Sequence, residues 1–144
     1  MAEFNADDVN NYNVQLVENF RANKGQVTIE PFTGAPLVLV HHVGAKSGTK
    51  RVTPLAYTRD GDNVIIIASK GGTPENPAWY HNLRANPDTT IELGPDTFEV
   101  TAEALTEGPE RERLYKQMAD QMPNFHEYQL KTDRLIPVVV LHRK

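Results

Sequence analysis

The chain has 144 residues, 39% hydrophobic and 24% charged, and this length and composition predict one globular domain over residues 1–144. Its formal net charge of -4 counts against general nucleic-acid binding, which usually requires a basic excess. It contains no cysteine, which excludes disulfides, thiolate nucleophiles and cysteine-ligated metal sites and fits a reducing cytoplasm. The polar and acidic first residues predict no secretory signal, so we expect a cytoplasmic protein.

The first predicted element is an amphipathic helix over about residues 6–24, with Asn5 as its N-cap and the Lys24-Gly25 pair at its end. Steps of three and four residues place its apolar side chains on one face: Val9, Tyr12, Leu16, Val17 and Phe20. We expect this face to pack on the core. The polar face carries too little positive charge to favour a helix that lies on a membrane surface.

Three segments rich in β-branched residues follow, at residues 36–43, 51–58 and 63–69, and each is predicted to form a strand. The Asp60-Gly61 pair between the last two favours a hairpin turn, because glycine adopts positive φ without steric cost. We therefore expect the three strands to form an antiparallel meander.

The second half of the chain mixes helices and strands. A short helix is predicted after Asn76, which we expect to be its cap, and a hairpin is predicted around residues 94–96. Two helices over residues 109–120 and 124–130 then precede a buried strand at residues 136–142. This order predicts an α+β fold in which six to seven mostly antiparallel strands curl into a small barrel with flanking helices.

A cationic turn separates the first two predicted strands. It holds a glycine, a hydroxyl group and three positive charges within six residues: Lys46, Ser47, Gly48, Lys50 and Arg51. A turn that contains glycine can aim several backbone N–H groups at one point, so phosphate or carboxylate is the ligand that it favours. The alternative is an ordinary solvated hairpin turn, in which lysines and a Ser-Gly pair are common.

A second cluster lies at the end of the third predicted strand, where Lys70 precedes two adjacent glycines, Gly71 and Gly72. Adjacent glycines allow a bulky group to approach the backbone closely. The helix start that follows carries Trp79 beside Tyr80, and the free N–H groups at a helix start favour an anion. Taken alone, Trp79 is better explained as a core residue.

A metal centre is not expected. His41 and His42 are neighbours on a predicted strand, so their side chains point to opposite faces and cannot easily share one metal ion. The other histidines have no companion acid or cysteine at the spacing of metal ligands.

Three blocks of the sequence occur in a fixed order. They read Gly44-x-Lys46-Ser47-Gly48-x-x-Arg51-x-x-Pro54-Leu55-x-Tyr57, then Ala68-Ser69-Lys70-Gly71-Gly72, then Asn76-Pro77-x-Trp79-Tyr80-x-Asn82-Leu83, and Ile136-Pro137-Val138-Val139 comes last. Together they resemble the deazaflavin-dependent nitroreductase and F420H2-dependent quinone reductase family over nearly the whole chain. The resemblance implies a split β-barrel that transfers a hydride from reduced coenzyme F420, an 8-hydroxy-5-deazaflavin, to a quinone-like or other small electrophilic acceptor.

By position, the resemblance implies a cofactor site in which the cationic turn and Lys70 hold the phosphate and the acidic oligoglutamyl tail. Residues 52–55 would line the ring with backbone amides, and the second and third blocks would complete the pocket. The implied cofactor-binding residues are Lys46, Ser47, Gly48, Lys50, Arg51, Val52, Thr53, Pro54, Leu55, Tyr57, Ala68, Ser69, Lys70, Gly71, Ala78, Trp79, Tyr80 and Asn82.

The resemblance also implies an acceptor site. Its catalytic hydrogen-bond donors would be Tyr57, Ser69 and Tyr128, and Met122, Phe125 and Tyr128 would bind the acceptor. The best-known nitroreductases carry more tyrosines in this last segment, so quinone reduction is expected and nitroimidazole activation is disfavoured. Three further points stay open: a carrier of F420, flavin or another small ligand without turnover, a monomer or a homodimer, and peripheral membrane contact with a lipid quinone.

Overall fold

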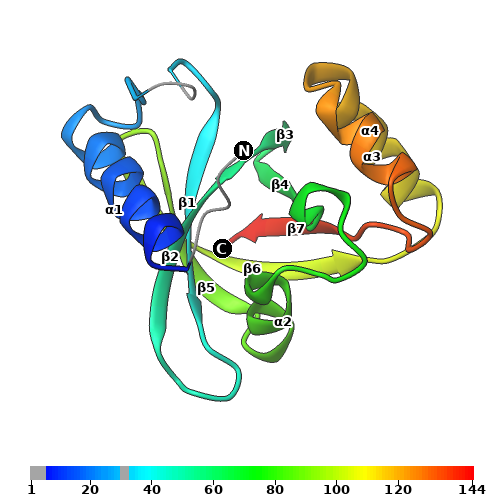
Figure 1. Cartoon of the computed structure of the whole chain (residues 1–144), viewed down its shortest axis with the longest axis horizontal. Coiled ribbons are helices and arrows are strands. Elements are labelled where there is room, and N and C mark those ends of the chain that lie inside the picture. The colour runs from blue at the N-terminus through cyan, green and yellow to red at the C-terminus, as the bar shows by residue number, and fades with distance from the viewer. Residues whose placement is uncertain (1–5, 30–32) are drawn as a thin grey trace.

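One antiparallel sheet of seven strands forms the centre of the computed structural model, which describes residues 6–29 and 33–144, with side chains described from Val14 onward. The strands lie in the order β2-β1-β5-β6-β7-β4-β3. Figure 1 shows that the sheet curls strongly into a half-barrel, so the α+β fold and its mostly antiparallel sheet are confirmed. The strands are β1 (Leu37–Val43), β2 (Lys50–Ala56), β3 (Thr58–Asp60), β4 (Asn63–Ile67), β5 (Asp88–Leu93), β6 (Asp96–Leu105) and β7 (Val138–Arg143).

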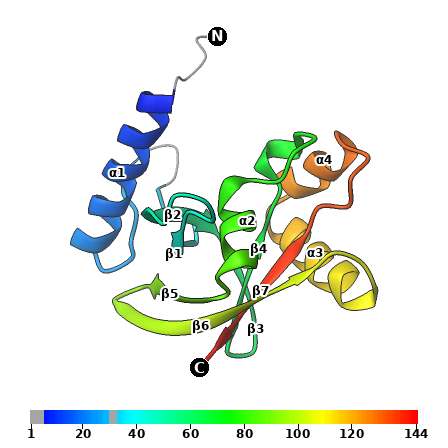
Figure 2. The same ribbon diagram turned by 90° about the horizontal axis from the view of Figure 1, so that it is seen from below.

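Within the described residues, four α-helices flank this sheet: α1 (Ala6–Ala22), α2 (Ala78–Ala85), α3 (Pro109–Gln121) and α4 (Asn124–Leu130). The helix α1 lies at one end of the sheet, α3 and α4 lie at the other, and α2 lies between them (Figure 1, Figure 2). In residues 6–29 and 33–144, no helix combines the length and the apolar character needed to cross a bilayer.

The first helix ends earlier than predicted. It stops at Ala22 because Lys24 and Gly25 adopt positive φ angles of 55° and 93°, and Gly25 N–H turns back to donate to Phe20 O at 2.7 Å. Its side chains Leu16 and Phe20 are buried, as predicted. The expected cap Asn5 and the side chains of Val9 and Tyr12 lie outside the described part of the chain.

Three apolar clusters surround the sheet. The first fills the inside of the curl, where β4 contributes Val64 and Ile66 and α2 contributes Leu83. The second lies on the opposite face of β4 and β7, beneath α3 and α4. The third joins α1 to the outer face of β1 and β2. Period-two alternation along β4 divides its side chains between the first two clusters, so both faces of this strand are buried.

The predicted meander is only partly correct. Residues 51–58 do not form one strand, because β2 ends at Ala56 and β3 begins at Thr58, and these two strands lie at opposite edges of the sheet. The chain passes from one edge to the other at Tyr57, which requires the sheet to curl. The hairpin between β3 and β4 is confirmed, with Gly61 at φ +62° between the paired residues Asp60 and Asn63.

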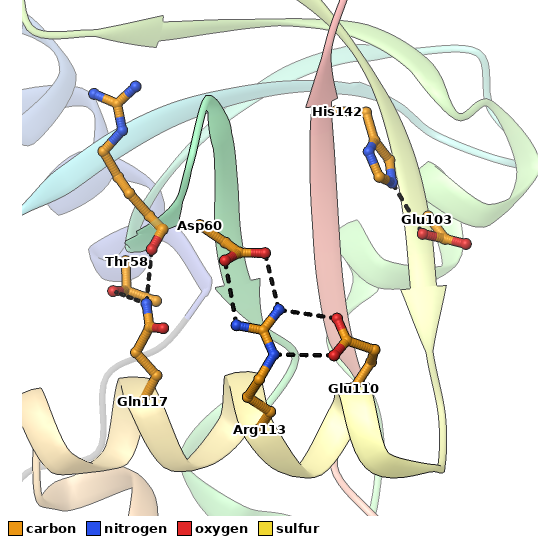
Figure 3. Close-up of polar contacts among 8 residues, drawn as sticks. Thr58, Asp60, Glu103, Glu110, Arg113, Gln117 and His142 are labelled. Carbon is orange, nitrogen blue, oxygen red and sulfur yellow. Dashed lines mark hydrogen bonds and ion pairs between the residues drawn. The ribbon is translucent and has the colours of Figure 1, made fainter.

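Polar contacts dock α3 onto β3, the short edge strand (Figure 3). Arg113 donates to both carboxylate oxygens of Asp60 at 3.3 and 3.0 Å and also to Glu110. One turn further along, the Gln117 amide donates to Thr58 Oγ1 and to the Arg59 carbonyl. These contacts cover an edge strand that would otherwise present unpaired backbone groups.

Candidate functional site

A cavity of about 820 Å³ lies between the β1–β2 turn and the start of α2. We call it the turn cavity. Its volume falls within the range of about 300–1,000 Å³ that is usual for small-molecule sites. It is lined by His42, Gly44, Ala45, Lys46, Ser47, Arg51, Thr53, Ala78, Trp79, His81 and Asn82.

Short-range hydrogen bonds shape the turn itself. Gly44 N–H donates to Thr49 O and Gly48 N–H donates to Gly44 O, both at 2.9 Å. The Ser47 hydroxyl folds back over the turn and accepts from Thr49 N–H at 3.2 Å. A Cβ on Gly44 would lie 2.3 Å from this hydroxyl, and Gly48 adopts φ +70°, so both positions favour glycine.

The three cations of the turn are available to bind an anion. Lys46, Lys50 and Arg51 are exposed, and none of them lies within 4.0 Å of a carboxylate among the side chains that the structure describes. Lys70, which precedes Gly71 and Gly72, does have a carboxylate partner, because its Nζ lies 3.6 Å from Glu75 Oε2. The turn therefore concentrates unpaired positive charge at one end of the cavity.

Buried polar groups form the inner wall of the turn cavity. Asn82 Oδ1 accepts from Ala45 N–H at 3.0 Å, Asn82 Nδ2 lies 2.9 Å from His42 Nδ1, and His42 Nε2 lies 2.8 Å from Thr53 Oγ1. His42 is 5% exposed, and burial, with smaller effects from the charge of Arg51 and from His41, lowers its pKa to about 4. The imidazole is therefore neutral at physiological pH.

The start of α2 closes the cavity opposite the turn. The expected side-chain cap is absent, because Pro77 occupies the cap position and Asn76 Oδ1 instead accepts from Arg134 at 2.7 Å. Trp79 and Asn82, on consecutive turns of the helix, both line the cavity. Trp79 also packs in the first apolar cluster, which confirms its interpretation as a core residue, and its role toward a cofactor stays a prediction.

One arginine holds the loop that contains Lys70, Gly71 and Gly72 in place. The guanidinium of Arg134 donates to four backbone carbonyls, those of Ala68, Ser69, Thr73 and Glu75, at 2.9–3.2 Å. Sequence reasoning missed this residue, since an isolated arginine in the segment before β7 carries no motif. The loop conformation therefore depends on a side chain that is distant in the sequence.

The structure brings together part of the predicted cofactor site. The predicted residues that line the turn cavity are Lys46, Ser47, Arg51, Thr53, Ala78, Trp79 and Asn82. Gly48 and Lys50 belong to the same turn without lining the cavity. Four lining residues were not among the predicted site residues: His42, Gly44, Ala45 and His81.

The other predicted cofactor residues do not line this cavity. Leu55, Tyr57, Ala68 and Tyr80 pack in or against the first apolar cluster, which also contains Trp79. Val52 packs toward α1 in the third cluster, because side chains alternate along β2. Val52 also lines a smaller hollow of about 400 Å³ between α1 and β2, which shares Arg51 and Thr53 with the turn cavity.

Three of the predicted acceptor residues lie at the second apolar cluster, beneath α3 and α4, whereas Tyr57 packs against the first cluster. Met122, Phe125 and Tyr128 pack against the second apolar cluster, and none of them lines the turn cavity. They lie close to the Lys70-Gly71-Gly72 segment, because an added Cβ on Gly72 would lie 2.6 Å from Tyr128 O. Ser69 is buried at the start of this loop, beside the 3₁₀ turn Lys70–Gly72.

Comparison with known proteins identifies the family of the chain. The model of the F420H(2)-dependent quinone reductase family matches residues 13–143. The F420H(2)-dependent quinone reductase Rv1261c of Mycobacterium tuberculosis is 43% identical over 127 residues, which cover 87% of this chain and 85% of that protein.

Solved structures extend the comparison. An F420-H2 dependent reductase (FDR-A) is 44% identical, with a TM-score of 0.68 over 74% of this chain and 94% of that one. A chain described as a domain-swapped dimer is 35% identical, with a TM-score of 0.70 over 96% of this chain and 100% of that one. The haem storage protein HutZ of Vibrio cholerae, at 12% identity and a TM-score of 0.60, shares the fold alone. On this evidence the chain belongs to the F420H(2)-dependent quinone reductase family.

Proposed function

We propose that this protein, as one F420-binding domain, reduces a quinone by hydride transfer from reduced coenzyme F420, which it binds in the turn cavity. The observation that carries the proposal is that Lys46, Arg51 and Trp79 line one cavity in a chain of this family, with Lys50 in the same turn. When bound, the reduced deazaflavin supplies the hydride. The chain's own residues then have to bind an anionic tail, cover a flat ring and stabilise charge on the acceptor.

The cationic turn is suited to the anionic tail. Lys46, Lys50 and Arg51 offer positive charge without carboxylate partners among the described side chains, and Gly48 lets the backbone approach a ligand closely. Because these side chains are exposed, their attraction for an anion falls as salt is added. Lys70 would also bind the anionic tail once its ion pair with Glu75 is replaced by one with the ligand.

Among residues 52–55, one backbone N–H points away from the pairing of β2 with β1 and has no partner strand in the part of the chain that the structure describes. Tyr57 N–H donates to Pro36 O and Gly44 N–H donates to Thr49 O, and this alternation gives the odd-numbered residues of β2 their bonds to β1. Val52 N–H therefore points away from β1, at an edge that no other described strand pairs with. Pro54 has no N–H to offer. Within residues 52–55, we therefore assign the proposed backbone contact with the ring to the Val52 N–H.

Hydrogen-bond donors would stabilise the acceptor. A quinone that receives a hydride gains negative charge on an oxygen, and a hydroxyl placed near that oxygen stabilises the transition state. We assign this role to Tyr57, Ser69 and Tyr128. Ser69 and Tyr128 belong to two segments in contact at Gly72, which supports a shared acceptor site. Met122 and Phe125 would supply its apolar wall.

Turnover distinguishes this function from a carrier role. Purified protein is mixed with reduced F420 and a soluble naphthoquinone, and the absorbance of the oxidised cofactor is followed. Catalytic reappearance that depends on the quinone supports the proposal, and tight binding without turnover on any quinone contradicts it. The relatives named above are described as reductases, which gives no support to nitroreduction or to a carrier.

Charge reversal tests the location of the cofactor site. Glutamate at Lys46, Lys50 and Arg51 together should weaken F420 binding at least about tenfold at low salt, since it removes three charge-assisted contacts. The matched control is Arg59→Glu, which reverses an exposed cation on β3, at the other edge of the sheet. Equal affinity of the triple variant and the control would place the cofactor elsewhere.

The 35% identical relative described as a domain-swapped dimer supports a homodimer for this chain as well. Light scattering on the purified protein measures the mass directly, and a monomer at micromolar concentration would contradict this assignment. We also propose that the protein acts in the cytoplasm and touches the membrane surface when its acceptor is a lipid quinone. Cosedimentation with quinone-loaded vesicles tests that contact.

A further inference from the structure

A chain of polar side chains runs from the backbone of the cationic turn to the open side of the turn cavity. It begins at Ala45 N–H, continues through the side chains of Asn82 and His42, and ends at the Thr53 hydroxyl. Its two middle members are buried, at 7% and 5% exposure, whereas Thr53 is only half-buried and lines the cavity. We call this chain the turn relay.

The direction of every hydrogen bond in the turn relay is fixed from its backbone end. Ala45 N–H can only donate, so the atom of Asn82 that it meets at 3.0 Å is the carbonyl Oδ1. The other atom of the amide, Nδ2, can also only donate, and it lies 2.9 Å from His42 Nδ1. His42 Nδ1 must therefore accept and carry no proton.

The tautomer of His42 also fixes the direction of its hydrogen bond with Thr53. A neutral histidine with an unprotonated Nδ1 carries its proton on Nε2, which donates to Thr53 Oγ1 at 2.8 Å. The hydroxyl oxygen thus accepts from inside the protein. Its own hydrogen remains for a partner on the other side, toward the cavity that Thr53 and Arg51 both line.

We propose that the turn relay sets the Thr53 hydroxyl as a hydrogen-bond donor to an oxygen acceptor of the cofactor, with His42 and Asn82 as positioning residues. This inference rests on the proposed function, since it concerns the same cavity. The acceptor is a carbonyl or phosphate oxygen that carries no proton, because the free hydrogen of the Thr53 hydroxyl needs an acceptor. Arg51, two residues away on the same face of β2, gives that oxygen a positive neighbour.

The tautomer of His42 can be measured without any cofactor. Long-range ¹⁵N–¹H spectra of the imidazole distinguish a proton on Nε2 from a proton on Nδ1. The expected result for the free protein is the Nε2–H form. In Asn82→Asp, a carboxylate replaces the donor that faces Nδ1, so His42 should move its proton to Nδ1 or become charged. An Nδ1–H form in the unchanged protein would overturn the inference.

Variants of Thr53 test the donor itself and leave the buried pair intact. Thr53→Val keeps the shape of the side chain and removes the hydroxyl, and should weaken F420 binding about ten- to hundredfold, the range for a hydrogen bond to a charged or polarised oxygen. Thr53→Ser restores the hydroxyl and should restore the affinity. A deazaflavin riboside without phosphate, used as a second ligand, separates the two acceptors. A loss with both ligands indicates a ring carbonyl, and a loss with F420 alone indicates the phosphate.

The outcomes separate this inference from the proposed function. If the unchanged protein fails to bind F420, the proposed function falls and this inference falls with it. If the unchanged protein binds F420 and Thr53→Val binds it equally well, only the turn relay is overturned. The expected pattern is the Nε2–H tautomer, weakened binding in Thr53→Val and restored binding in Thr53→Ser.

Discussion

Two adjacent glycines offer a matched test of how closely α4 packs on the 3₁₀ turn Lys70–Gly72. Gly71 and Gly72 both adopt positive φ, at +66° and +83°. A Cβ on Gly71 would meet no atom within 4 Å, whereas a Cβ on Gly72 would lie 2.6 Å from Tyr128 O and 3.0 Å from Lys131 Cβ. The two positions therefore share the backbone strain of an alanine and differ in the collision.

The magnitudes follow from these two contributions. Alanine in a left-handed conformation costs about 1–2 kcal/mol, so Gly71→Ala should lower the free energy of unfolding by about that amount. Gly72→Ala adds an overpacking cost of about 1–3 kcal/mol, because the main collision is with backbone and neither side can rotate away. For a domain of this size, the added cost corresponds to a further drop in Tm of roughly 3–10 °C.

Urea unfolding and thermal melting of both variants measure the difference. We expect Gly72→Ala to be clearly less stable than Gly71→Ala and to show a raised KM for the quinone, because α4 carries the proposed acceptor residue Tyr128. Equal destabilisation of the two variants would refute the close approach of α4 to this loop. A larger effect at Gly71 would refute it as well.

Three further predictions concern polar side chains that are buried or half-buried. The pKa of His42 is lowered from 6.5 to about 4, so as the pH falls the imidazole takes up a proton in the unfolded chain before it does in the folded one. The free energy of unfolding is therefore unaffected by this group above pH 6.5 and decreases by roughly 3 kcal/mol as the pH falls toward 4. Urea unfolding at pH 7 and pH 4.5 should show this slope, and His42→Gln should flatten it. Arg134→Gln, which loses contacts to four carbonyls, should raise the Kd for F420 and increase proteolysis in residues 69–76, whereas unchanged cleavage there would contradict the role given to this arginine. Arg111 is 2% exposed and donates to Ile136 O and Gln129, so Arg111→Met should destabilise by about 3 kcal/mol, and Arg113→Met on the exposed face of the same helix should cost far less in the same unfolding assay.

Local patterns predicted most of the elements but not the way in which the sheet closes. Residues 51–58 form an uninterrupted run with strand character, and no residue in that run marks the change from one sheet edge to the other at Tyr57. That change is set by long-range pairing, because β2 bonds to β1 and β3 bonds to β4. The curl of the sheet is therefore a tertiary property that the sequence run does not encode locally.

In the candidate site too, some residues could be predicted from the sequence and others could not. The cationic turn and the start of α2 were expected to lie together because the family resemblance implies that both belong to one cofactor site, and the structure places them around one cavity. The contribution of His42 could not be predicted, because a histidine on a strand gives no signal that its partners are an asparagine and a threonine far along the chain. Arg134 was missed for the same reason.

The position of β7 in the middle of the sheet has a consequence for how the protein is made. This strand, the most C-terminal one described, pairs with β6 on one side and β4 on the other. It thus joins two groups of strands that share no other strand pairing within residues 6–29 and 33–144. On the ribosome, β3 and β4 emerge early and must wait for residues synthesised much later, such as Val138, the partner of Ile67. Folding of such non-local pairs is slow because the intervening loop has to close first. The loop that Arg134 holds can take its final form only then, so we expect nascent chains to acquire F420 affinity late, after β7 has been synthesised.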